Sequence, residues 1–512
     1  MSMTASPPPA AAPPADWRVR ARGWLGELRV PLVLTAVAFC VLALFAGHRF
    51  WHQSKAPQFV YQAMAFLHGK LELGVRPPNN EDWVFLHGKW YSSFPAFPAL
   101  LMVPLVAING YQLNDTSFTV IIAALNLLFF YLALRSLSRA GDSNRTEREN
   151  LILAGLLGFG TLYFYCAIRG EVWFTAEVMG VGLTALYVLF AHRGRNPALA
   201  GLFFSAGTLT RAPIMFSVVF ILCEIFAPSG RPGELFAKVE RERRKQQLVA
   251  LGQFVMGALP LALWHMWMNW ARFGSVTDFG HDHLYNNRVN ADIARWGMFN
   301  LHYLTRNIAS AFLLLPRWAH GAASGLSYNP HGLSLLLTTP LFALALFPAA
   351  SKGHKDRVYW ALALAAAAVL YPWFFDRGPD PRSPFAAPTF GASGYLIFGL
   401  VAGRLLWLMR TANAPRAATS KAAGPAEAEP PRLQFALALT VAVMALPGLF
   451  YQNDGYIQFG FRFSLDWAPY LFLLLAAGRR PMRGLFWALA SVGLAVNAWG
   501  ALAFRGYSDM FR

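Results

Sequence analysis

Long uncharged apolar runs recur along this chain, and they restrict its fold more than any other feature. Residues 120–130 and 361–370 are two examples. Soluble domains do not carry many runs that approach about 20 residues, the length that a helix needs to cross the hydrocarbon core. Because 56% of the residues are apolar, only 14% are charged, and no barrel-like alternation is present, the sequence predicts an all-α polytopic integral membrane protein.

The net charge of +18 comes mainly from basic residues in short loops beside the apolar runs. Lys and Arg concentrate in the cytoplasmic loops of membrane proteins, so this distribution indicates topology and gives no reason to expect a nucleic-acid partner. The basic loops are residues 135–148, 192–195, 231–245, 352–357, 410–432 and 479–483. All of them lie in the cytoplasm only if residues 94–109, which contain Pro95, Pro98 and Pro104, do not cross the bilayer. We therefore expect an interfacial or re-entrant helix there.

With that choice the sequence predicts about 13 transmembrane helices and a cytoplasmic N-terminus. The first span follows a cluster of arginines and has no convincing signal-peptidase site after it, so we expect it to stay as an anchor. The predicted spans are near residues 31–47, 118–138, 150–168, 172–191, 197–210, 212–228, 247–270, 333–350, 357–375, 390–410, 433–451, 466–478 and 483–504. The extracytoplasmic side then receives two long loops, residues 48–117 and 271–332, where we expect short interfacial helices and the chemistry of the protein.

The composition indicates a single transmembrane domain, residues 31–504, between two tails. Residues 1–30 combine a Pro/Ala-rich segment, too poor in large side chains to fold, with a basic flank. Residues 411–432 are a predicted cytoplasmic linker, and residues 505–512 are a short C-terminal tail.

Residues 451–466 place Asp454, Arg462 and Asp466 between two apolar runs. Membrane proteins keep ionisable groups near their spans when these face a polar cavity, pair with another charge or bind a charged substrate. Gln458 comes one helical turn before Arg462, and Asp466 one turn after it. If the segment is helical, all three side chains lie on one face.

Together these patterns resemble the GT-C superfamily of membrane glycosyltransferases, which includes protein O-mannosyltransferases and the aminoarabinose transferase of lipid A. The resemblance covers most of the chain. It depends on the long outside loop after the first span, on Gly170, Trp173 and Glu177 at the start of the fourth span, on Thr210-Arg211-Ala-Pro213, and on the stretch from Gln458 to Asp466.

The resemblance implies transfer of a sugar from a polyprenyl-phosphate carrier to a glycan, lipid or protein acceptor outside the cytoplasm, with no cofactor. It also implies an acidic base in the first loop and Arg or Lys on the lipid phosphate. We accordingly expect a multi-pass protein of the bacterial inner membrane whose active site faces outside.

The first loop departs from the family pattern, because it has no carboxylate between the first span and Glu72. The candidate bases are Asp82, Glu81 and Glu72. Asp82 is favoured by its aromatic surroundings, which raise a carboxyl pKa and offer faces on which sugars stack. Trp83, Lys89 and Tyr91 are the candidate substrate-binding residues nearby. The alternative is that Glu81 and Asp82 are ordinary solvated turn residues after two prolines.

Three arginines qualify as phosphate ligands, since a guanidinium group makes bidentate contacts and is always charged. They are Arg462, Arg211 and Arg169, and Arg169 lies near Glu171. The competing interpretation for each is an interfacial arginine that snorkels or forms a salt bridge. Gln458 and Asp466 favour a functional interpretation for Arg462.

Other chemistry finds little support in the sequence. His281-Asp282-His283 supplies two imidazoles but no further ligand at metal-site spacing, and the three cysteines lie within apolar segments, so we predict neither a metal site nor a disulfide framework. Residues 301–316 have apolar residues at helical spacing and are predicted to lie along the interface, where they either border a lipid tail or pack under the loops. Two other functions stay open: a transporter or flippase of lipid-linked sugar, and a noncatalytic membrane assembly protein.

Overall fold

The computed structural model describes residues 17–285, 287–318, 326–327, 331–348, 388–412, 431–455 and 457–504. The predicted span 357–375, the tail before residue 17, most of the linker 411–432 and the tail 505–512 lie outside the described residues. The described α-helices are α1 (Trp17–Ala46), α2 (Gln58–Leu67), α3 (Phe97–Asn109), α4 (Asp115–Arg139), α5 (Glu147–Phe159), α6 (Tyr163–Ala167), α7 (Val172–Ala191), α8 (Pro197–Thr208), α9 (Val218–Phe226), α10 (Arg241–Phe273), α11 (Asn287–Trp296), α12 (Leu304–Phe312), α13 (Leu335–Thr338), α14 (Phe342–Ala345), α16 (Pro388–Thr411), α17 (Gln434–Phe450), α18 (Ala468–Ala477) and α19 (Gly484–Ala503).

Short 3₁₀ helices and two small hairpins connect these helices. The 3₁₀ helices are η1 (Gly47–Trp51), η2 (Gly110–Gln112), η3 (His192–Gly194), η4 (Ala212–Ser217), η5 (Pro232–Phe236), η6 (His281–His283), η7 (Leu301–Tyr303) and η9 (Arg462–Asp466). The antiparallel hairpins pair β1 (Trp83–Leu86) with β2 (Lys89–Ser92), and β3 (Arg317–Trp318) with β4 (Leu326–Ser327).

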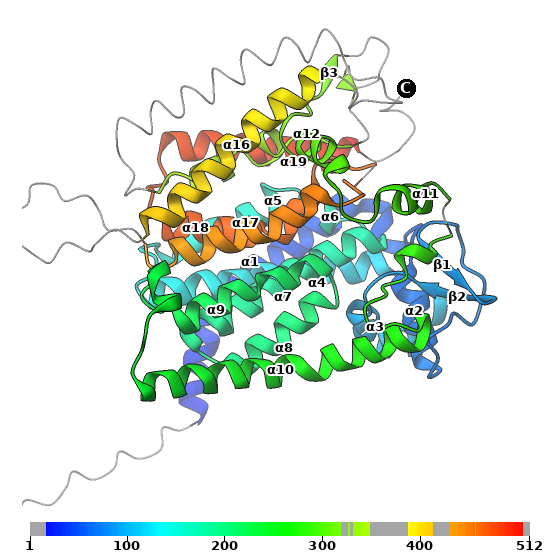
Figure 1. The fold of residues 1–512 in the computed structure, drawn as a ribbon, viewed down its shortest axis with the longest axis horizontal. Coiled ribbons are helices and arrows are strands. Elements are labelled where there is room, and N and C mark those ends of the chain that lie inside the picture. The colour runs from blue at the N-terminus through cyan, green and yellow to red at the C-terminus, as the bar shows by residue number, and fades with distance from the viewer. Residues whose placement is uncertain are drawn as a thin grey trace, which may run out of the picture.

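Most of the described chain is a bundle of apolar helices, as expected for a polytopic membrane protein (Figure 1). Within the described part, five segments are long and apolar enough to cross a bilayer: Arg29–Trp51, Asp115–Arg139, Val172–Gly194, Arg241–Phe273 and Gly484–Ala503. Five shorter apolar helices accompany them. The predicted count of about 13 spans is therefore not confirmed.

Two predicted spans are not continuous helices. Residues 333–350 contain the short helices α13 and α14, separated at Thr339 and Pro340. Residues 150–168 are divided between α5 and α6, because the helix ends at Gly160. Apolar composition marked these segments as membrane-embedded, but it does not report where the backbone breaks.

Local capping explains several helix starts. Thr146 accepts the backbone N–H of Glu149, while the Glu149 side chain accepts the N–H of Thr146, which forms a capping box for α5. Asn114 caps α4 by accepting from Ser117. Asn196 caps α8, where Pro197 occupies the first turn and needs no hydrogen-bond acceptor.

Glycines permit the closest helix contacts. A Cβ atom at Gly201 of α8 would lie 2.0 Å from the carbonyl oxygen of Phe254, and one at Gly257 of α10 would lie 1.9 Å from that of Ala198. Backbone atoms cannot yield that far, so only glycine allows α8 and α10 to lie this close. In Figure 1 the two helices run side by side at one edge of the bundle.

The first long loop folds into α2, the β1–β2 hairpin and α3, which gather with α11 at one end of the bundle (Figure 1). We call this the hairpin end. The hairpin turn is formed by His87 and Gly88, both with positive φ, as a tight two-residue turn requires. The hairpins are short additions to a mostly helical fold, and only short helices were expected in these loops. Strands of four residues, such as β1 and β2, are too short to show a clear alternation of polar and apolar residues in the sequence.

Helix α3 corresponds to the predicted interfacial segment 94–109. It has 13 residues, or about 20 Å, against a hydrocarbon core of about 30 Å. Its first residue, Phe97, donates its backbone N–H to Leu209 at the end of α8. The length agrees with a helix that does not cross the bilayer alone.

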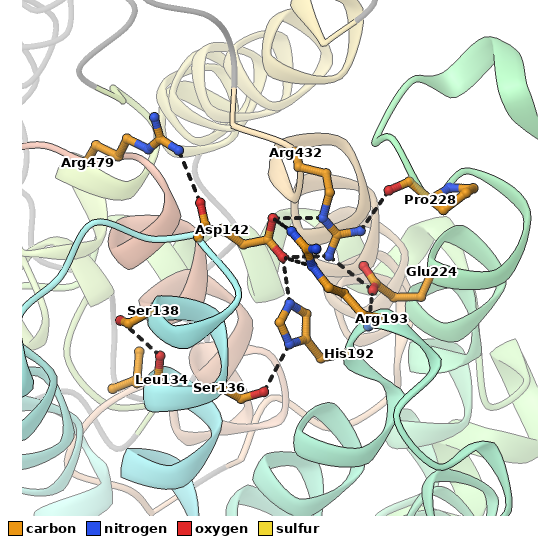
Figure 2. Close-up of polar contacts among 11 residues, drawn as sticks. Leu134, Ser136, Ser138, Asp142, His192, Arg193, Glu224, Pro228, Arg432 and Arg479 are labelled. Atoms are coloured by element: carbon orange, nitrogen blue, oxygen red, sulfur yellow. Dashed lines mark hydrogen bonds and ion pairs between the residues drawn. The ribbon is translucent and has the colours of Figure 1, made fainter. Parts of the chain in front are cut away.

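At the end of the bundle opposite the hairpin end (Figure 1), a mostly buried cluster of charges joins four segments, as Figure 2 shows. Asp142 accepts hydrogen bonds from His192, Arg193 and Arg432, and Arg432 also bonds Glu224 at 3.1 Å. We call this the Asp142 cluster. Asp142 follows α4, and His192 and Arg193 follow α7. Glu224 lies in α9 and Arg432 precedes α17, so the cluster joins the ends of these helices.

Candidate functional site

A second group of buried charges lies at the hairpin end. Its residues come from the start of α7, from the break between α8 and η4, and from η9. Most of them are among the site residues that the sequence predicts, although they are as far apart along the chain as Arg169 and Asp466. The fold brings them together because α7 contacts η9 and α8 contacts η4.

Glu177 is at the centre of this group and is only 1% exposed. Its Oε1 lies 3.1 Å from Nε of Arg462 and 4.0 Å from Nη1 of Arg211. The Arg462 contact is short but not aligned for a hydrogen bond, so it is an ion pair by distance alone. The thiol of Cys166 donates to the other carboxylate oxygen at 3.5 Å. A buried carboxylate requires such cationic neighbours.

Arg211 makes a bidentate pair with Asp466, with nitrogen–oxygen distances of 3.0 and 2.7 Å. Burial alone would lower the pKa of Arg211, but the Asp466 carboxylate outweighs it and raises the pKa. The guanidinium group also lies over the ring of Phe463 at 5.2 Å. Arg211 therefore stays charged in this buried position.

The predicted helical face of Gln458, Arg462 and Asp466 is corrected by the structure. Only Arg462 to Asp466 is helical, and that segment is a 3₁₀ helix, while Gln458 precedes it. Arg462 pairs with Glu177 and Asp466 pairs with Arg211, so the two residues serve different partners on other elements. A spacing of four residues places side chains together only in an α-helix, and Gly460 and Phe461 interrupt it.

The guanidinium group of Arg462 has unused donors. It lies 5.2 Å from the ring centre of Phe174 and 5.6 Å from that of Phe463, and its side chain is 7% exposed. Within the described part of the chain, its two terminal nitrogens donate to no protein acceptor. A guanidinium group whose terminal nitrogens make no hydrogen bond within the described protein is suited to an anionic ligand, because it can donate to two oxygens at once.

Arg169 and Glu171 form a separate pair next to this group. Nε and Nη2 of Arg169 lie 3.1 and 2.7 Å from the two Glu171 oxygens. Burial would raise the pKa of Glu171, but the Arg169 charge lowers it below its usual value. Both arginines contact the ring of Phe174, because Arg169 lies 5.1 Å and Arg462 lies 5.2 Å from its centre. Arg169 thus has a protein partner for its fork, unlike Arg462.

Asp82 approaches the group from the first loop. Its Oδ2 accepts the indole N–H of Trp173 at 2.8 Å, and Trp173 lies one turn before Glu177 on α7. The backbone of Asp82 has φ of +53°, and its carbonyl oxygen accepts from Ser93 at 2.6 Å.

The other two candidate bases of the first loop, Glu72 and Glu81, have different electrostatic surroundings. Glu72 pairs with Lys89 at 3.3 Å on an exposed part of the hairpin, and a hydrogen bond from its own backbone, together with Lys89, lowers its pKa. Glu81 is exposed. Partial desolvation of its carboxyl group raises its pKa, and the charges of Asp82 and Glu171 act in the same direction.

Trp83 and Tyr91 are packing residues, which corrects the prediction that they stack against a sugar. Trp83 is fully buried against Tyr61, and its indole N–H donates to Asn79. Tyr91 packs against Phe273 in a small cluster under the hairpin. The aromatic residue that donates a hydrogen bond to Asp82 is Trp173, which comes from a distant part of the chain.

Two buried polar pairs at this end were not predicted as site residues. Asp454 accepts from Ser310 at 2.7 Å and from His331, and Asp115 accepts from the backbone and hydroxyl of Ser54. Asp454 stood out in the sequence as a charge between apolar runs, whereas nothing in the local sequence connects it to His331.

The His281-Asp282-His283 turn is the 3₁₀ helix η6, where His283 bonds Asp278 at 3.0 Å. Searched over the described residues alone, His, Cys, Asp and Glu form no group of three or more that could hold a metal ion.

An open apolar hollow of about 400 Å³ lies where η7 meets the end of α17. Its lining comprises Phe299, Asn300, Leu301, Leu446, Pro447 and Phe450. The predicted interfacial segment 301–316 therefore contributes to a surface hollow, and the helix α12 follows directly.

No protein-family model matches the sequence, and no curated protein matches it either. Among solved structures, the chain is similar to the apo form of the oligosaccharyltransferase of Archaeoglobus fulgidus, with a TM-score of 0.31 and 13% identity over 86% of this chain and 56% of that one. The same enzyme tethered to an acceptor peptide gives a TM-score of 0.34 and 12% identity over 88% of this chain and 56% of that one. This chain thus spans little more than half the length of that protein. At TM-scores this low, the likeness assigns neither a site nor an activity.

Proposed function

We propose that this protein is a membrane glycosyltransferase that moves a sugar from a polyprenyl-phosphate carrier to an acceptor on the extracytoplasmic side. The observation that supports this most is Arg462, a nearly buried guanidinium group whose terminal nitrogens donate to no acceptor in the described chain. A phosphate group fits such a fork because it offers several acceptor oxygens and a matching charge.

In the proposed reaction, Arg462 holds the donor phosphate and Arg211 adds positive charge nearby. Glu177 and Asp466 fix the two arginines through the ion pairs at 3.1 and 2.7 Å. The acceptor hydroxyl attacks the anomeric carbon of the sugar, and the bond from that carbon to the phosphate oxygen breaks. The polyprenyl phosphate leaves with the bonding electrons, so the arginines stabilise the charge that develops on it.

Asp82 is the proposed base. It takes the proton of the acceptor hydroxyl as the new bond forms. The hydrogen bond from Trp173 holds its carboxylate near the start of α7, on which Glu177 also lies. The apolar hollow beside α17 offers a place for part of the lipid tail. We propose Arg169 and Glu171 as a supporting pair, because each already has the other as its partner.

The test is Arg462→Lys, which keeps the charge but removes the bidentate fork. Binding of undecaprenyl phosphate to the purified protein is measured with undecaprenol as the control ligand, and Arg76→Lys, an exposed arginine of the first loop, is the control variant. We expect Arg462→Lys to weaken phosphate binding at normal protein abundance. Unchanged binding would contradict the assignment of Arg462.

Lipid analysis of cells with and without the protein separates the proposed activity from the two other functions. If the protein is a transferase, its deletion makes the polyprenyl-phosphate sugar accumulate on the outer side of the membrane. A flippase would leave the same lipid on the inner side. A noncatalytic assembly protein would tolerate the simultaneous loss of Asp82 and Arg462.

A further inference from the structure

Asp454 and His331 form a buried pair next to the segment that carries Arg462. Asp454 is 2% exposed, and its Oδ2 accepts from Ser310 at 2.7 Å and from Nδ1 of His331. Nε of Arg306 lies 3.9 Å from the same oxygen. Burial would raise the pKa of Asp454, but His331 and Arg306 outweigh it and lower the pKa, so this carboxyl group is ionised.

One side chain links this pair to the proposed phosphate ligand. Nε2 of Gln458 donates to the carbonyl oxygen of His331 at 2.8 Å and to that of Asp454 at 2.6 Å. Oε1 of Gln458 accepts the backbone N–H of Arg462 at 3.3 Å. The amide of Gln458 thus contacts His331, Asp454 and Arg462 at once.

The backbone around the pair has little room to move. Leu333 donates to Phe459 at 2.9 Å and accepts from Phe461 at 3.2 Å, so residues 331–334 run beside residues 458–461. A Cβ atom at Gly332 would lie 2.9 Å from the backbone of Gly460 and 3.0 Å from Cγ of Gln458. The segment before α13 and the segment before η9 are therefore held in close contact, and the charged pair closes one end of this contact.

We propose that His331 and Asp454 are positioning residues for Arg462, which act through Gln458 and set the guanidinium group for phosphate binding. This inference depends on the proposed function of Arg462. Loss of the Asp454 charge weakens the hydrogen bonds that its Oδ2 accepts from His331 and Ser310. The two carbonyl groups that hold Gln458 are then less firmly placed, and with them the Gln458 oxygen that accepts the backbone N–H of Arg462.

The experiment is a double-mutant cycle between His331→Gln and Arg462→Gln, read out as the affinity for farnesyl phosphate, with farnesol as the ligand without phosphate. Glutamine at position 462 keeps a donor for Glu177. In the wild-type background we expect His331→Gln to weaken farnesyl phosphate binding by about tenfold. In the Arg462→Gln background we expect less than about a twofold further loss, because the residue through which His331 acts is already gone.

Two more variants keep the test decisive. Asp454→Asn should reproduce the effect of His331→Gln, and the two changes together should cost little more than either alone. His302→Gln replaces an exposed histidine stacked on Trp296 and should leave binding unchanged. Equal losses of affinity from His331→Gln in both backgrounds would overturn the positioning role, because they would show a general structural effect.

The proposed function fails in a different way. If Arg462→Gln itself leaves farnesyl phosphate binding unchanged, the assignment of Arg462 is wrong. If Arg462→Gln weakens binding while His331→Gln and Asp454→Asn do not, only the positioning role is wrong.

Discussion

At the scale of single residues, the hairpin end shows how the partners of a charge decide what it can do. Arg169 and Arg462 contact the same ring of Phe174 at nearly equal distances, 5.1 and 5.2 Å. Arg169 gives two nitrogens to one carboxylate, whereas Arg462 meets Glu177 only through Nε. A bidentate pair uses the fork of an arginine, so the two residues differ in their capacity for a ligand.

Asp82 is the residue on which the proposed chemistry depends most. Asp82→Asn keeps the size of the side chain and an oxygen that can accept from Trp173, but it removes the basicity. We expect turnover to fall by about 10²–10⁴-fold, as is typical when a general base is lost, with donor binding retained. The assay measures sugar transfer in membranes supplied with donor and acceptor.

Glu72→Gln is the matched control for Asp82→Asn, because Glu72 lies in the same loop and pairs with Lys89 on an exposed surface. It should leave turnover within about twofold, since exposed ion pairs contribute little. Full turnover by Asp82→Asn would remove Asp82 from the mechanism. Loss of turnover in Glu72→Gln alone would move the role to Glu72.

At the scale of elements, the crossing of α8 and α10 depends on two glycines. Gly257→Ala would place a methyl group 1.9 Å from the carbonyl oxygen of Ala198, so the helices must separate. We expect a loss of about 1–3 kcal/mol in the free energy of unfolding, as for other overpacked sites. The measurement is thermal unfolding of the purified protein in detergent.

Gly252→Ala provides the control on the same helix. No atom lies within 4 Å of a Cβ placed at Gly252, and alanine favours a helix by about 0.5–1 kcal/mol over glycine. This variant should therefore unfold at the same or a slightly higher temperature. Equal losses in the two variants would mean that the close crossing does not limit stability.

The short helix α3 permits a test of topology. In a background of Cys40→Ser, which removes the exposed native cysteine, single cysteines replace Lys70, Asn109 or Arg243. If α3 does not cross the membrane, an impermeant thiol reagent should label positions 70 and 109 from outside and position 243 only after membrane disruption. Labelling of position 109 only after disruption would show that α3 crosses.

At the scale of the whole molecule, the two ends of the bundle use charge differently. The Asp142 cluster satisfies its charges internally: both oxygens of Asp142 accept from arginines, and Glu224 accepts from Arg432 (Figure 2). Burial would raise the pKa of Asp142, but the bonds from His192, Arg193 and Arg432 outweigh it and hold the pKa well below its usual range. The cluster therefore stabilises the fold in its ionised form.

A carboxyl group with a lowered folded-state pKa stabilises the protein above its unfolded pKa, about 3.9 for Asp, and this stability is lost as the pH falls further. We expect the unfolding temperature to be constant from about pH 8 to pH 5 and to drop below about pH 4. Asp142→Asn should remove about 3 kcal/mol at pH 7, the lower end for a broken buried pair, because Arg193 is half-exposed.

Glu242→Gln, at an exposed carboxylate of α10, is the control for Asp142→Asn and should leave both the unfolding temperature and its pH dependence unchanged. The difference in stability between the wild type and Asp142→Asn should shrink below about pH 4, because protonation then makes the two side chains alike. A difference that persists at low pH would mean that Asp142 acts through shape and not through charge.

The sequence by itself determined that this chain forms apolar helices and that polar chemistry gathers between them. Length and composition are enough for this, because a bilayer admits few structures and each apolar run reports its own preference for helix. Arg462, Asp466, Arg211, Glu177 and Asp82 were also recognisable, since a charge beside an apolar run costs free energy and needs a reason.

Only the tertiary structure decided which of these charges meet. The pairs of Arg462 with Glu177, Arg211 with Asp466 and His331 with Asp454 join residues more than 120 positions apart. The breaks within residues 150–168 and 333–350, and the packing of Trp83 and Tyr91, also depend on neighbours from other elements. Spacing along a chain reports contacts within one helix, whereas contacts between helices follow from how the whole bundle packs.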